Sequence, residues 1–155
     1  MRIKVSLNDV NIIKNYLNLC LFTKQSNETV KRFNPINDLD KTFEDGEIDE
    51  ELVLEEILEY LDLSVLLNVL EKFLLKCSKG CELTIVGIDA YLVAKDFTFH
   101  KISLEEYNEL VYDLNSVKRA VLTLDRLSSF LPKRGFKILK KEYQGYHYLI
   151  KAIKC

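Results

Sequence analysis

The 155 residues fit one domain, and 48% hydrophobic with 30% charged residues is the balance of a globular protein. Only two prolines and five glycines are present, which excludes a long disordered linker. The formal net charge of −2 argues against a dedicated nucleic-acid-binding protein, and the sequence has no apolar run of the roughly 18 residues that a membrane span requires.

The cysteines form no C-x-x-C pair, and only two histidines are present to complete a metal site. We therefore expect no metal site, and we expect free thiols in a reducing, cytoplasmic environment. Because Met1 to Lys4 is followed by a polar break, we also expect no signal peptide. The cysteines are Cys20, Cys77, Cys81 and Cys155, and the histidines are His100 and His147.

Charge is unevenly distributed along the chain. Acidic residues dominate from Asp38 to Asp62, where Lys41 is the only base, and basic residues dominate from Lys118 to Lys154. This pattern is compatible with two solvated faces of one domain. The alternative is a dipolar surface that orients a partner or another copy of the chain.

The first third of the chain predicts three strands. Alternating apolar residues over 2–7 predict the first, and the apolar and aromatic run over 16–22 predicts the second. A short third strand is expected within 30–36, where Pro35 limits its length. Polar turn residues separate these segments.

The middle of the chain alternates between helix and strand signals. Strong helix formers over 50–60 predict a helix from local propensity alone. A second helix begins at a cap provided by Asp62 or Ser64 and ends before Gly80. The β-branched run over 82–88 then predicts a buried central strand.

The last third predicts three helices followed by a hairpin. The helices are expected over 91–97, over 103–112 behind a capping box at Ser103, and over 124–131 behind Thr123. Strands over 136–143 and 146–153 flank a turn at Gly145. The order predicts one α/β domain over 1–155, with a mostly parallel sheet and an antiparallel C-terminal hairpin; an α+β sandwich is the alternative.

Several segments in order resemble class I S-adenosylmethionine-dependent methyltransferases, over roughly residues 30–154. Residues 38–50 (DLDKTFEDGEIDE) are similar to the acidic loop and P-F-x-D-x-S-x-D segment that leads into the fourth strand of that family. Residues 78–85 (SKGCELTI) are similar to its L-K-P-G-G-x-L-x-I turn and fifth strand, and 135–150 to its closing hairpin. The resemblance implies a Rossmann-like sheet and makes 50–54 a strand, against the propensity for helix.

The front of the chain departs from that family. A glycine-rich loop normally follows the first strand and lets the backbone approach the cofactor. Here Asn8 to Lys14 follows, and no glycine precedes Gly46. Cys20 stands near the place of the acid that binds the cofactor ribose, and a thiol is a poor partner for two hydroxyls. The intervening helix is reduced to a short connection, so the sheet is shortened at its N-terminus.

Candidate site residues are few. Asp38 matches the acid that lies near the adenine in the family, and it is the one residue proposed to bind the cofactor; a solvated turn residue in an acidic loop is the interpretation that we favour for it. Glu55 and Glu56 stand where relatives often carry a small residue and a histidine near the substrate, and they offer no methyl-transfer chemistry. No catalytic residue is assigned.

Other chemistries find little support in the sequence. An acidic pair is almost inevitable in so acidic a stretch, so it does not indicate glycoside hydrolysis. His100 and His147 are expected to be structural, and no P-loop or H-E-x-x-H motif is present. Tyrosines and lysines over 140–151 suit either base stacking or a sheet edge protected by lysines.

We therefore expect a degenerate methyltransferase-like domain that acts as a non-catalytic binding or structural module, in a setting such as a viral or phage assembly. It would use no cofactor and would have a protein partner or self-associate, with neither nucleic acid nor membrane as a partner. It would reside in the cytoplasm, or in a virion if viral. The alternative is an active S-adenosylmethionine-dependent methyltransferase with an atypical cofactor loop.

Overall fold

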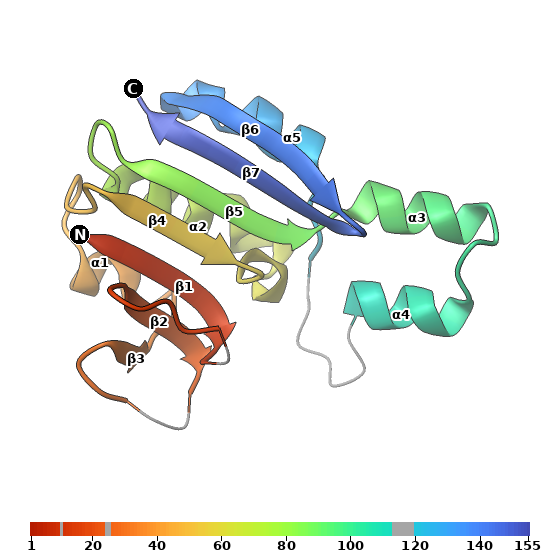
Figure 1. The fold of residues 1–155 in the computed structure, drawn as a ribbon, viewed down its shortest axis with the longest axis horizontal. Coiled ribbons are helices and arrows are strands. Elements are labelled where there is room, and N and C mark those ends of the chain that lie inside the picture. Colours follow the sequence, from red (N-terminus) through yellow and green to blue (C-terminus); the bar gives the residue numbers. More distant parts are fainter. Residues whose placement is uncertain (10, 24–25, 113–119) are drawn as a thin grey trace.

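The computed structural model describes residues 1–9, 11–23, 26–112 and 120–155. Its centre is one seven-stranded sheet with the order β3-β2-β1-β4-β5-β7-β6 (Figure 1). The strands are β1 (Arg2–Asn8), β2 (Leu17–Phe22), β3 (Val30–Arg32), β4 (Glu51–Glu55), β5 (Glu82–Ile88), β6 (Phe136–Gln144) and β7 (His147–Lys154).

The first five strands run parallel to one another, and β7 is antiparallel to both β5 and β6. The predicted mostly parallel sheet with an antiparallel C-terminal hairpin is therefore confirmed. The strand order reverses between β1 and β4, because the chain first builds toward β3 and then returns to build toward β5. In open α/β sheets such a switch point is where ligands bind, outside the carboxyl ends of the strands.

Helices cover one face of the sheet, which lies at the back in Figure 1. That face carries the main hydrophobic core, to which Leu39, Leu70 and Leu127 contribute from three different helices. The helices are α1 (Leu39–Thr42), α2 (Leu63–Lys76), α3 (Ala90–Thr98), α4 (Leu104–Tyr112) and α5 (Leu124–Phe130), with 3₁₀ turns η1 (Leu58–Tyr60) and η2 (Pro132–Arg134). Of these, α3 and α4 form a hairpin that projects beyond the sheet (Figure 1).

The segment after Glu50 forms strand β4, so the helix that local propensity predicts over 50–60 is wrong and the strand implied by the family resemblance is correct. Leu52 and Leu54 are fully buried. They pair with Ile3 and Val5 of β1 on one side, and β5 pairs with β4 on the other. Hydrogen bonding from both neighbours, together with burial of alternate leucines, outweighs the helix propensity of the glutamates.

The opposite face of the sheet carries none of the described helices. Residues 11–16, which lead from β1 into β2, cross it as an irregular chain (Figure 1). Nζ of Lys4 donates to the carbonyl of Asn11 at 2.5 Å, and the side chain of Asn18 binds both the amide and the carbonyl of Ile13. These contacts hold the connection against the sheet in the place where a crossover helix would otherwise lie.

Two predicted helix starts are confirmed by their hydrogen bonds. At α4, the amide of Glu106 donates to Oγ of Ser103, and its carboxylate accepts from the amide of Ser103, which completes a capping box. At α5, Oγ1 of Thr123 accepts from the amide of Arg126 at 3.1 Å. No helix within the described ranges is long and apolar enough to cross a bilayer.

Candidate functional site

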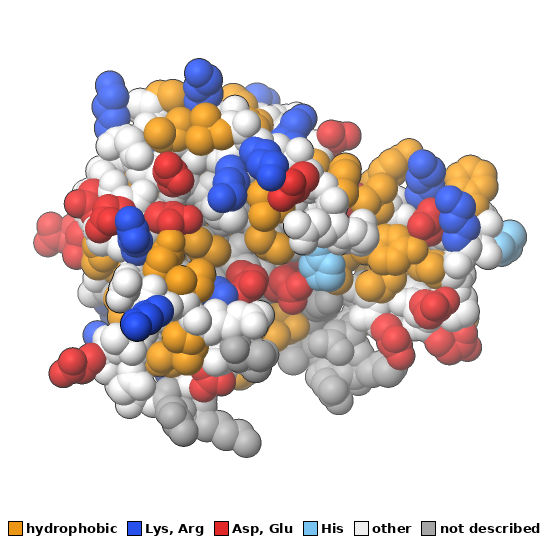
Figure 2. All heavy atoms as spheres, in the orientation of Figure 1, with side chains coloured by type: hydrophobic (Ala, Val, Ile, Leu, Met, Phe, Trp, Pro, Cys, Tyr) orange, Lys and Arg blue, Asp and Glu red, His pale blue; other side chains and the backbone are white. Residues whose placement is uncertain are grey.

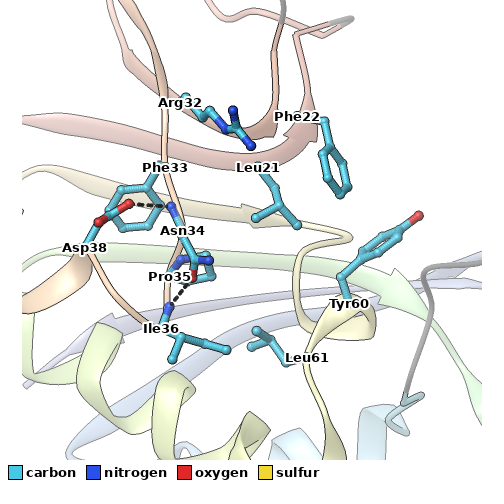
Figure 3. A pocket seen from close by; sticks show the side chains of 10 residues that line it. All are labelled: Leu21, Phe22, Arg32, Phe33, Asn34, Pro35, Ile36, Asp38, Tyr60 and Leu61. Atoms are coloured by element: carbon cyan, nitrogen blue, oxygen red, sulfur yellow. Dashed lines mark hydrogen bonds between the residues drawn. The ribbon is translucent and has the colours of Figure 1, made fainter.

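A cavity of about 510 Å³ opens at the carboxyl ends of β2 and β3, beside the turn that follows β4 (Figure 3). We call it the strand-end cavity. It lies at the carboxyl edge of the parallel strands, where ligands of open α/β sheets bind, and on the β2 and β3 side of the reversal between β1 and β4. Its lining residues are Leu21, Phe22, Arg32, Phe33, Asn34, Pro35, Ile36, Asp38, Tyr60 and Leu61.

Asp38, the predicted cofactor contact, does line this cavity and is half-buried. Its Oδ2 accepts a hydrogen bond from the backbone amide of Asn34 at 2.8 Å, and its own amide donates to the carbonyl of Asn34 (Figure 3). The carboxylate therefore closes the loop between β3 and α1. This structural task is compatible with either interpretation of Asp38, so its contact with a cofactor remains a prediction.

Cys20 does not reach the strand-end cavity. It is fully buried inside β2, and its Sγ lies 3.7 Å from Oγ of Ser6 on the neighbouring strand. Burial raises the pKa of the Cys20 thiol, so the neutral form is favoured. The residue at the carboxyl end of β2 is Phe22, which is 49% exposed and offers no hydrogen-bonding group to a ribose.

The paired glutamates at the end of β4 point to different places. Glu55 forms an ion pair with Lys4 on the face without helices. Glu56 has a left-handed φ of 53° and its Oε1 lies 2.8 Å from Nε2 of His147 on β7. Neither glutamate therefore lines the strand-end cavity, and each has a partner that explains its position.

A second cavity, of about 490 Å³, separates the helical hairpin from the sheet. Glu56 and His147 lie on the sheet side, and Glu106 and Glu109 of α4 lie on the other. Tyr146 also lines it and donates from its hydroxyl to Asp96 of α3 at 2.9 Å. Its polar lining is thus mainly acidic. Two of its polar side chains already have partners, because Glu56 pairs with His147 and Tyr146 pairs with Asp96.

Other predicted candidates are structural in this fold. Tyr148 is only 1% exposed, so its ring cannot stack on a base. The base-stacking surface that the tyrosines of the C-terminal hairpin could form therefore does not include Tyr148. Cys77 and Cys81 are buried neighbours, and a hydrogen bond from the Cys77 thiol to Cys81, together with burial, raises the pKa of Cys77. Within the described part of the chain, no group of three or more His, Cys, Asp or Glu side chains is placed to hold a metal ion.

Of the residues that line the strand-end cavity, only Asp38 was predicted from the sequence; Phe22, Arg32 and Tyr60 are among those that sequence reasoning missed. One signal could have indicated Phe22 and Arg32. In a parallel sheet, residues at the carboxyl ends of strands share one edge, so the ends of the predicted second and third strands had to meet there. Tyr60 ends the 3₁₀ turn that follows β4, and the sequence contains no signal that predicts this turn.

Comparison with solved structures shows that this fold is that of class I S-adenosylmethionine-dependent methyltransferases. A SAM-dependent methyltransferase from Archaeoglobus fulgidus matches with a TM-score of 0.58 at 14% identity, over 90% of this chain and 76% of that one. A candidate S-adenosylmethionine-dependent methyltransferase from Listeria monocytogenes matches with a TM-score of 0.60 at 13% identity, over 90% and 80%.

A SAM-dependent methyltransferase from Methanosarcina mazei matches with a TM-score of 0.54 at 14% identity, over 81% of this chain and 66% of that one. At such low identity these similarities define the fold and not the activity. No protein-family model matches the sequence, and no curated protein sequence matches it.

Proposed function

We propose that this chain is a non-catalytic, methyltransferase-like domain that serves as a binding or structural module. The observation that carries the proposal is the connection from β1 to β2. Where the fold usually places a glycine loop and a helix, an irregular chain is tied to the sheet by Lys4 and Asn18. Residues 9 and 11–16 of this connection form no helix, so they offer no helix N-terminus with free amides to a ligand.

The residues at the strand-end cavity also fit the methyl donor poorly. S-adenosylmethionine carries a sulfonium cation and a ribose with two hydroxyl groups. Phe22 ends β2 in place of a carboxylate, and the guanidinium of Arg32 gives the cavity lining a charge of the same sign as the sulfonium. We therefore assign no catalytic step to this site.

The test is calorimetric titration of the full chain with S-adenosylmethionine and with its demethylated product. We expect no binding heat and no rise in melting temperature at millimolar concentration, because only a ligand that binds the native state raises that temperature. A dissociation constant in the micromolar range for either compound would refute the proposal.

An active enzyme with an atypical loop is the second candidate, and one observation favours it. Asp38 lines a cavity of ligand size at the correct edge of the sheet. This alternative predicts that S-adenosylmethionine raises the melting temperature and that Asp38→Ala reduces the rise. Asp40→Ala, on the exposed side of the same acidic segment, is the control and should leave the rise unchanged.

The module would act through a protein partner or through self-association, and the face without helices is the surface we propose for it (Figure 2). Leu149 and Ile153 of β7 are half-buried on this face, with exposed Lys151 between them. Leu149→Lys should weaken any association measured by sedimentation. Leu75→Lys, on the exposed side of α2, is the matched control. If the chain sediments as a monomer, both alone and in the presence of any protein isolated as its partner, this surface does not mediate association.

A further inference from the structure

The strand-end cavity is lined by two charged side chains, Arg32 and Asp38. The guanidinium of Arg32 is exposed, and none of the described residues forms an ion pair or hydrogen bond with it. The other charged lining residue, Asp38, has one carboxylate oxygen engaged by the amide of Asn34. Arg32 is therefore the charged lining residue that has no hydrogen bond or ion pair among the described residues, and its guanidinium can bind an anion.

Aromatic and aliphatic side chains form most of the remaining wall. Phe22, which is 49% exposed, reaches the cavity from the end of β2, and Tyr60, which is only 8% exposed, borders it from the turn after β4 (Figure 3). Leu21, Ile36 and Leu61 add aliphatic surface. A flat, partly apolar ligand is the shape that such walls accommodate, because aromatic rings bind other planar groups by offset or edge contacts.

We propose that the strand-end cavity binds a nucleoside monophosphate, with the phosphate at Arg32 and the base against the exposed ring of Phe22. Guanidinium groups bind phosphate oxygens through two parallel hydrogen bonds, and aromatic side chains stack on bases of any sequence. The volume of about 510 Å³ lies within the range of small-molecule sites. The cavity thus combines an anion-binding group with a base-binding wall.

This inference extends the proposed function by naming a ligand for the binding module, and the same residue supports both. A cation at the rim repels the sulfonium of the methyl donor and attracts a phosphate. The ligand site would then lie at the same edge of the sheet as in methyltransferases of this fold, but it would prefer an anionic ligand to a cationic one. Because the two ligands differ in charge, their binding can fail or succeed independently.

The experiment is titration of the full chain, by calorimetry, with adenosine 5′-monophosphate, adenosine, inorganic phosphate and S-adenosylmethionine. We expect the monophosphate to bind, and adenosine and phosphate alone to bind at least about tenfold more weakly, since each retains only part of the contacts. Binding of the monophosphate should weaken as salt is raised, because the contact is ionic.

Arg32→Gln should lower the affinity for the monophosphate about tenfold or more and leave that for adenosine unchanged. The matched control is Lys31→Gln, which removes an exposed cation from the same strand but does not line the cavity. Phe22→Ala should weaken both the monophosphate and adenosine. Phe22 is half-exposed, so this variant should fold even if Arg32→Gln proves unstable.

Equal affinity for adenosine and its monophosphate would overturn the inference. So would an unchanged affinity in folded Arg32→Gln, or no binding of the monophosphate at millimolar concentration. Micromolar binding of S-adenosylmethionine would instead refute the proposed function, whatever the monophosphate does. Melting curves of each variant confirm that a lost affinity is not a lost fold.

Discussion

Lys4 of β1 and Glu55 of β4 form an ion pair at the centre of the sheet face that carries none of the described helices. The Lys4 side chain is only 3% exposed and that of Glu55 is 29% exposed. The same ammonium group donates to the carbonyl of Asn11, so it joins the sheet to the connection that crosses it. The ion pair therefore helps to hold the connection over this face of the sheet, where a helix would otherwise pack.

Lys4→Met should destabilise the domain by about 1–3 kcal/mol, because it removes a charged hydrogen-bond donor but keeps the buried apolar stem. Urea unfolding measures this change. Amide exchange at Ile13 should also accelerate, since that amide belongs to the connection that Lys4 secures. Lys31→Met, at an exposed position of β3, is the control and should change stability by less than about 0.5 kcal/mol. Equal effects of the two variants would contradict this role for Lys4.

Gly87 of β5 lies where no side chain can be accommodated. A Cβ atom there would lie 2.5 Å from the hydroxyl oxygen of buried Tyr148 and would overlap the carboxylate of Glu59. That carboxylate cannot move freely, because it accepts the amide of Ile88 at 2.8 Å. Gly87→Ala should therefore cost about 3 kcal/mol through overpacking.

Gly46→Ala separates this steric effect from backbone strain. Gly46 has a φ of 75° but open space around its Cβ position, so alanine there should cost only about 1 kcal/mol. Thermal or urea unfolding of both variants makes the comparison. If the two substitutions cost the same, the close contact at Gly87 is not the cause of its sensitivity.

The order of elements could be predicted because the hydrophobic pattern and turn residues agree with the final structure over most of the chain. The segment Glu51–Glu55 is the exception. Its local preference for helix is overcome by hydrogen bonds from two neighbouring strands, which are distant in sequence. Only the family resemblance, which brings in the order of whole elements, pointed to a strand there.

The strand-end cavity could be predicted only in part. Asp38 was found because it sits in a segment that resembles a known family. Arg32 and Tyr60 were not, because they meet only after β3 and β4 take their places on either side of β2 and β1. Position at the end of a strand, more than residue type, is what identifies such residues.

Tyr16 and Glu51 provide a test at alkaline pH. The hydroxyl of Tyr16 donates to the Glu51 carboxylate, and this hydrogen bond raises the pKa of Tyr16 from 10.0 to about 12. Because the folded state holds the proton more tightly than the unfolded state, the bond contributes its full stability below pH 10. That contribution is lost as the pH rises from 10 toward 12.

Tyr16→Phe should therefore remove stability at neutral pH and make the decline between pH 10 and 12 less steep than in the wild type. The difference between the two proteins is the quantity to measure, because lysines also titrate in this range. Exposed Tyr91 of α3 offers the control, since Tyr91→Phe should leave the slope unchanged. Parallel pH curves for the wild type and Tyr16→Phe would show that the pair does not couple folding to pH.

Asp89, which follows β5, holds two helices in place from one buried side chain. Its Oδ1 accepts the amides of Tyr91 and Leu92 at the start of α3, and its Oδ2 accepts the amide of Leu124 at the start of α5. Asp89→Ala should cost about 2–4 kcal/mol, because three amides lose their acceptor and two helices lose a terminal anion.

Asp89→Asn provides a finer test of the same arrangement. The amide oxygen can still cap α3, but the NH₂ group then faces the amide of Leu124, so two donors oppose each other. Amide exchange should therefore rise at α5 and remain low at α3. Thr123→Ala removes only the second cap of α5 and should cost about 1 kcal/mol in urea unfolding. A cost for Asp89→Ala no greater than that for Thr123→Ala would mean that the two helices are positioned by their apolar contacts with the sheet, and not by this carboxylate.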